Sequence, residues 1–207
     1  SMVADYPLQI TPSGDRRIRK TANLMMEKFF HKGAFFQDII HSGINAYLTL
    51  DIAETLLREK DSRYAKLLRS VADLASPTGQ WPEAIHPITF GGCMGDGQHG
   101  WAAAEWAMLV RNLFVREEGK TLVLGSGILP EWTESGSPLS FGPTKTPFGS
   151  VSVKFFRKDG KAMFQIDADF KRAPSLPESV IIDVPGYKKT QVEDTDQTLV
   201  TLEEAKP

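Results

Sequence analysis

Four stretches in the first half of the chain carry apolar residues at helical spacing. Residues 15–30 and 62–75 each have a single apolar stripe between charged positions, which is typical of an amphipathic helix with one buried face. Residues 45–60 are apolar on nearly every side, and the first half of 99–116 is almost wholly apolar. The order amphipathic, buried, amphipathic, buried predicts two antiparallel helical hairpins in two layers, with the second and fourth helices inside.

Two long loops separate these helices, at 31–44 and at 76–98. The second and third helices are joined by a short turn at Asp61, so the two long loops should meet at one end of the helical layer, at the N-termini of the inner helices. Loops of this length in compact domains are usually functional or disordered. Trp81 and Phe90 argue against disorder in the second loop, so we expect the functional site at this end.

After residue 119 the pattern changes from helical spacing to strands. Alternating or β-branched runs predict strands at 121–124, 150–157, 161–170, 179–184 and 198–202. Lys158, Asp159 and Gly160 form a hairpin turn between two of them, and a Pro- and Gly-rich linker covers 125–149. The sequence therefore predicts an α+β chain with a helical domain at 1–119 and a β-rich domain at 120–207, built as an antiparallel sheet or sandwich.

Composition and charge narrow the possible partners. The chain of 207 residues has a formal net charge of -2, which gives no electrostatic reason to expect nucleic acid or an anionic membrane surface as a partner. No apolar run approaches the ~20 residues that span a bilayer. The single Cys93 excludes an internal disulfide framework and favours a reducing compartment such as the cytoplasm.

Metal and cofactor motifs are also missing from the sequence. His86, Cys93, Asp96 and His99 are metal-capable side chains close together in the chain, but they lack the tight Cys or His pairs of zinc sites. Nothing matches a P-loop, a dinucleotide-binding fingerprint or a nucleophile elbow. We therefore expect neither a bound metal nor a cofactor.

The loop at 76–98 and its surroundings offer side chains suited to sugar chemistry. Glu83 follows Pro82 and is either a catalytic carboxylate or a surface residue in a turn, and Asp96 is either functional or a turn residue between glycines. Aromatic rings stack on the apolar faces of sugars, and we favour Trp81 over the helical tryptophans as such a platform. The remaining candidates for sugar binding are Gln37, His41, His86, His99 and Trp101. Gln37 and His41 could equally satisfy backbone groups at the start of the second helix.

Two segments carry a family resemblance. The segment 76–87 contains Pro-Glu-Ala-Ile-His, and the segment 95–106 contains His-Gly-Trp-Ala-Ala-Ala-Glu. Together they resemble the last hairpins of six-hairpin (α/α)6-toroid glycosidases, the superfamily of glucoamylases and trehalases, where a Pro-Glu-Gln-x-Trp-like segment carries the catalytic base. An Ala at position 84 and a His at position 86 depart from that pattern. The resemblance implies that Glu83 is the general base of an inverting O-glycosidase.

The resemblance also implies that this chain holds only part of such an enzyme. A closed toroid has six hairpins and this chain supplies two, so the general acid is expected in an earlier hairpin. The expected function is the C-terminal portion of a glycoside hydrolase, inactive alone and able to self-associate through the apolar faces of its inner helices. The alternative is a non-catalytic carbohydrate-binding or interaction module on the same scaffold.

Overall fold

The computed structural model describes residues 2–40, 42–95, 97–170, 173, 175–192 and 197–205. It has the mixed α+β composition that the sequence predicts. The chain divides into two compact units, an N-terminal unit of residues 1–110 and a C-terminal unit of residues 111–207. The division falls nine residues before the predicted one at 119/120, because β6 (Val115–Glu118) pairs with β7 (Thr121–Leu124) and so belongs with the strands that follow.

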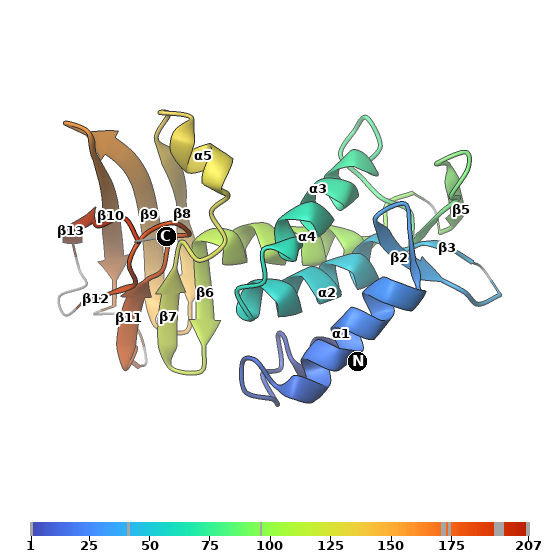
Figure 1. The fold of residues 1–207 in the computed structure, drawn as a ribbon, viewed down its shortest axis with the longest axis horizontal. Coiled ribbons are helices and arrows are strands. Elements are labelled where there is room, and N and C mark those ends of the chain that lie inside the picture. Colours follow the sequence, from blue (N-terminus) through green and yellow to red (C-terminus); the bar gives the residue numbers. More distant parts are fainter. Residues whose placement is uncertain are drawn as a thin grey trace. The chain divides into compact units, whose positions relative to one another are not determined.

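The predicted helices are all present, each beginning one residue later and ending two residues earlier than predicted. They are α1 (Arg16–Lys28), α2 (Ala46–Arg58), α3 (Arg63–Asp73) and α4 (Gly100–Phe114). A short 3-10 helix, η1 (Met2–Ala4), precedes them. In the N-terminal unit α2 contacts both α1 and α3, and it lies between them in Figure 1. No helix in the described ranges is long and apolar enough to cross a membrane.

The burial of the helices confirms the prediction for α2 and corrects it for α4. Eleven of the thirteen residues of α2 are buried, and α3 buries one stripe that includes Tyr64, Leu67 and Val71. In α4, Ala102 and Leu109 are buried, but the side chain of Trp101 is 65% exposed and Ala103, Ala104 and Ala107 are exposed as well. If α4 were an inner helix, as predicted, other parts of the protein would cover this apolar face. None of the described residues covers it.

Both long loops form strands instead of remaining irregular. The strands are β1 (Phe30–His31), β2 (Ala34–Gln37), β3 (Gly43–Ile44), β4 (Ala84–Ile85) and β5 (Gly92–Met94). They form one sheet in the order β1-β2-β3-β4-β5, with every neighbouring pair antiparallel. Ile44 of the first loop pairs with Ile85 of the second. The prediction that the two loops meet is confirmed, and the contact between them is a backbone ladder.

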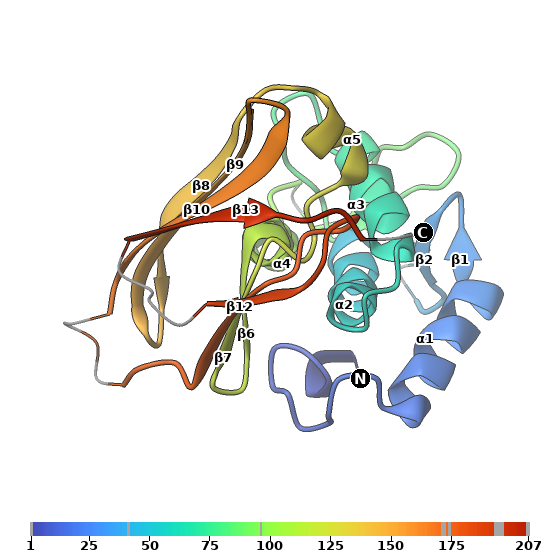
Figure 2. The ribbon, with the colours of Figure 1, turned by 60° about the vertical axis from the view of Figure 1, so that its left-hand side comes forward.

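The C-terminal unit contains two four-stranded sheets (Figure 2). One has the order β13-β10-β9-β8 and the other β12-β11-β7-β6. Besides β6 and β7, the elements are α5 (Pro130–Glu134), β8 (Leu139–Thr146), β9 (Gly149–Lys158), β10 (Lys161–Asp169), β11 (Ser179–Ile182), β12 (Thr190–Val192) and β13 (Gln197–Leu202). The five predicted strands are found, while β6, β8 and β12 were not predicted.

One strand pair contradicts the antiparallel prediction. β11 runs parallel to β7, with Ile181 beside Val123, because a crossover that contains α5 and the β8–β10 strands connects the two. The predicted hairpin between β9 and β10 is confirmed. Lys158 pairs with Lys161, and both central turn residues have positive φ, 51° at Asp159 and 75° at Gly160, as a two-residue hairpin turn requires.

The core of the C-terminal unit lies between its two sheets. Side chains from both sheets are fully buried there: Leu122 and Leu124 of β7, Phe155 of β9 and Phe164 of β10. A Cβ atom added at Gly125, directly after β7, would come within 3.0 Å of the Phe164 ring. The two sheets therefore pack on each other as the layers of a sandwich.

Candidate functional site

Asn45 connects the two long loops, 31–44 and 76–98, to the start of α2. Its Oδ1 accepts a hydrogen bond from the Leu48 N–H at 3.0 Å, which caps the helix. Its Nδ2 donates to Gln37 Oε1 at 2.9 Å and to the Glu83 carbonyl at 3.0 Å. The side chain is fully buried. Asn45 was not among the predicted site residues, although an Asn directly before an apolar helical run is a typical N-cap signal.

Glu83 has its backbone fixed on both sides. Its N–H donates to the Met94 carbonyl at 3.1 Å, and its own carbonyl accepts from Asn45. Gly95 has φ 79°, and a Cβ there would lie 3.3 Å from the Glu83 Cβ, so the chain passes close to Glu83 at a position that favours glycine. The half-buried Glu83 side chain therefore stands on a fixed backbone.

Three rings gather at the start of α2 and α4, and one of them, Tyr47, lies near Glu83. The centroid of the Tyr47 ring lies 5.2 Å from that of His99 and 5.5 Å from that of Trp101. Burial raises the pKa of the Tyr47 phenol, and the negative charges of Glu83 and then Asp51 raise it further. His99 is anchored by its N–H, which donates to the Trp81 carbonyl at 2.8 Å. We call Tyr47, Glu83, His99 and Trp101 the Glu83 cluster.

Two further carboxyl groups lie one helical turn deeper. Asp51 follows Tyr47 by four residues on α2, and Glu105 follows Trp101 by four on α4, so each shares a helix face with a ring of the cluster. Burial raises the pKa of Asp51 to about 6. Burial, followed by the charge of Asp51, raises the pKa of Glu105 to about 7. With a pKa of about 7, Glu105 keeps its proton in part at neutral pH and is able to donate it. Neither residue was predicted from the sequence as part of the site.

Some residues that were predicted to bind sugar make structural hydrogen bonds instead. Trp81 is 5% exposed, and its Nε1 donates to the Val71 carbonyl at 2.8 Å. Protein atoms cover both of its ring faces, so the expected sugar platform is wrong for Trp81, and the open ring belongs to Trp101. His86 Nδ1 accepts the backbone N–H groups of the turn at residues 88 and 89. His41 and Asp96 lie outside the described residues.

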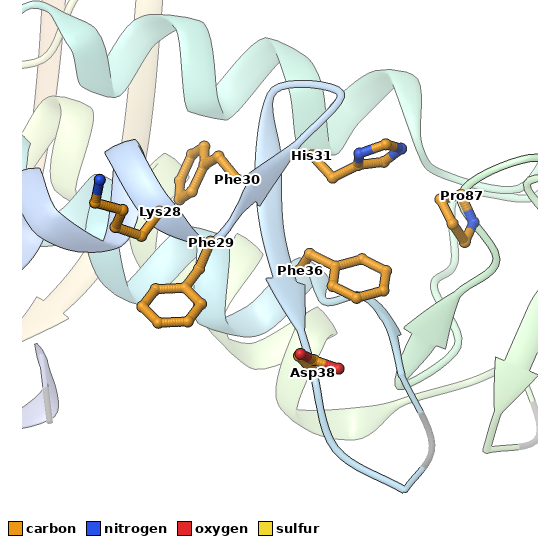
Figure 3. A pocket seen from close by; sticks show the side chains of 7 residues that line it. All are labelled: Lys28, Phe29, Phe30, His31, Phe36, Asp38 and Pro87. Carbon is orange, nitrogen blue, oxygen red and sulfur yellow. The ribbon is translucent and has the colours of Figure 1, made fainter.

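A separate pocket of about 370 Å³ opens at the same sheet (Figure 3). It is lined by Lys28, Phe29, Phe30, His31, Phe36, Asp38 and Pro87. Phe36 and Gln37 are neighbours in β2 and so point to opposite faces of the strand. Because Gln37 contacts Asn45 on the side of the Glu83 cluster, Phe36 and the pocket belong to the other face of β2.

No group of three or more His, Cys, Asp or Glu side chains in the described part of the chain is arranged to hold a metal ion. Comparison of the chain with protein-family models, with curated proteins and with solved structures gives no match.

Proposed function

We propose that the N-terminal unit supplies the general base and one wall of the sugar site of an inverting O-glycosidase, with the two hairpins belonging to an (α/α)6-type toroid. The single observation that carries the proposal is the position of Glu83. Its backbone is fixed by Met94 and Asn45, and its carboxylate acts on the nearby Tyr47 phenol. The Tyr47 ring in turn contacts the open ring of Trp101.

This arrangement has the parts that the reaction needs on the base side. A general base must hold a carboxylate next to the water that attacks the anomeric carbon, and a fixed backbone limits the positions that the carboxylate can take. Trp101, 65% exposed, offers a face on which a sugar ring can stack. In the proposed enzyme the catalytic acid comes from an earlier hairpin, as the resemblance implies.

The exposed face of α4 favours a second candidate, a non-catalytic carbohydrate-binding module. Trp101, Ala104 and Ala107 are exposed on this helix, and an open aromatic ring binds sugars without any acid or base. Such a module would bind oligosaccharides through Trp101 and would not need the carboxylate of Glu83.

The substitution Glu83→Gln, made in the protein with all of its hairpins, separates the two candidates. Loss of the base should lower kcat by about 10²–10⁴ while sugar binding is retained. Glu27→Gln, on the exposed surface of α1, is the matched control and should leave kcat unchanged. Near-normal turnover by Glu83→Gln would show that Glu83 is not the base. If no glycoside in a broad panel is hydrolysed, and Trp101→Ala alone abolishes binding, the second candidate is correct.

A further inference from the structure

The pocket shown in Figure 3 has the composition of a ligand site, and the proposed function does not use it. Phe29, Phe36 and Pro87 give it apolar walls, and Lys28, His31 and Asp38 contribute polar groups. Its volume of about 370 Å³ falls within the range of small-molecule sites. Six of the residues come from the continuous stretch 28–38, which runs from the end of α1 through β1 and β2, and Pro87 comes from the loop after β4. Two segments far apart in the sequence therefore meet at this pocket.

The polar groups of the pocket have unused hydrogen-bonding capacity. The Asp38 carboxylate and the His31 imidazole form no hydrogen bond or ion pair with any described residue. The His31 ring instead packs against Phe36, with the ring centroids 6.0 Å apart. Lys28 pairs with Glu27 at 2.7 Å. An aromatic wall is therefore flanked by one acceptor carboxylate and one imidazole that are available to a ligand.

We propose that this pocket is an accessory carbohydrate site, which stacks a neutral sugar ring on Phe36 and hydrogen-bonds its hydroxyl groups through Asp38 and His31. It is distinct from the Glu83 cluster because Phe36 and Gln37 point to opposite faces of β2. The inference goes beyond the proposed hydrolysis, since binding here requires no catalytic group.

The charges and polar groups of the pocket favour a neutral polyhydroxylated ligand over the other chemical classes. Lys28 and Asp38 carry opposite charges, so these two residues give the pocket no excess charge to select an anion or a cation. A purely apolar ligand would bury Asp38 and His31 without partners, which is costly. A pyranose ring provides both an apolar face for Phe36 and hydroxyl donors for Asp38.

The test is a titration of the whole chain with maltotriose, cellotriose, xylotriose and mannotriose, followed by ¹H–¹⁵N NMR. At least one sugar should shift the amide signals of residues 28–38, with a dissociation constant on the order of 1 mM. Phe36→Ala should weaken that binding at least about tenfold, and Asp38→Asn about threefold to tenfold, because each removes one recognition element. The matched control is Phe90→Ala, which removes a 51% exposed ring that does not line the pocket.

The outcomes separate this site from the proposed catalytic one. Unchanged affinity in Phe36→Ala, or no shift at 28–38 with any of the four sugars, overturns the accessory site. Binding that is lost in Trp101→Ala and kept in Phe36→Ala also overturns it, while supporting a sugar site at the Glu83 cluster. Binding that Glu83→Gln leaves intact and Phe36→Ala abolishes supports the accessory site, whatever the fate of the catalytic proposal.

Discussion

The two units differ in the length of their strands and in the number of polar side chains that they bury. In the N-terminal unit the strands are two to four residues long, whereas β8, β9 and β10 in the C-terminal unit are eight to ten residues long. Among the described residues, seven buried polar or charged side chains lie in the N-terminal unit and four in the C-terminal unit. In the long strands β9 and β10, apolar and polar side chains alternate, so apolar packing on one face forms the core. The short strands β2 and β3 are held by buried polar side chains such as Asn45 and Thr49, and these contacts position the residues of the candidate site.

The largest expected effect tests the packing of the C-terminal unit. Phe164 is fully buried between the two sheets, so Phe164→Ala should lower the free energy of unfolding by about 3–5 kcal/mol. The control is Phe156→Ala, on the opposite face of the β9–β10 hairpin and only half-buried, which should cost less than half as much. Urea unfolding followed by circular dichroism measures both variants. Equal losses would show that the alternation of β9 and β10 does not define the core.

A smaller loss is expected from the polar junction of the N-terminal unit. Asn45→Ala removes the α2 cap and two hydrogen bonds, to Gln37 and to Glu83, and should cost about 2–3 kcal/mol. Asn23→Ala, which removes an exposed bond to Arg63, is the control and should cost under about 0.5 kcal/mol. The same urea titration compares the two. If Asn45→Ala lowers the free energy of unfolding as little as Asn23→Ala, the loops 31–44 and 76–98 hold their positions without the hydrogen bonds of Asn45.

The pattern of apolar positions was sufficient to predict most of the secondary structure. Helical spacing located α2 and α3 and the apolar stripe of α3, and alternation at Val151, Val153 and Phe155 located β9. The short strands β1 to β5 escaped prediction, because two to four residues carry too little alternation to be distinguished from a loop. The exposure of α4 also escaped, since an apolar sequence indicates that a face should be covered without showing what covers it.

The candidate site was predicted in part, for reasons that concern its long-range contacts. Position at the loop end of the helices, together with the family resemblance, led to the selection of Glu83, His99 and Trp101. Trp81 was judged from its loop position, and its burial depends on a bond to Val71 ten residues away. Asp51 and Glu105 become neighbours only when α2 and α4 pack together, and no spacing within one helix indicates that contact.

The smallest expected effect concerns the two buried carboxyl groups and the pH dependence of stability. Burial raises the pKa of Asp51 from 3.8 to about 6 and that of Glu105 from 4.5 to about 7. Between these values the folded chain binds more protons than the unfolded chain, so the free energy of unfolding falls as pH rises. Stability contributed by the protonated groups is complete below about pH 4 and is lost as the pH passes through about 6 and 7.

Replacing both groups with their neutral amides should remove this dependence. The double variant Asp51→Asn, Glu105→Gln is expected to be more stable than the unsubstituted chain at pH 8 by about 1 kcal/mol, a value reduced for the water around the half-exposed Glu105. The difference should be smaller at pH 4.5 than at pH 8, because Asp51 and Glu105 are then protonated in the folded chain and only partly ionised in the unfolded chain. Urea midpoints at pH 4.5, 6 and 8 measure the difference, and Glu27→Gln on the surface of α1 should retain the pH slope of the unsubstituted chain. If the double variant keeps that slope, Asp51 and Glu105 are better solvated than their burial indicates. Burying these two carboxyl groups then costs the N-terminal unit less stability than their raised pKa values indicate.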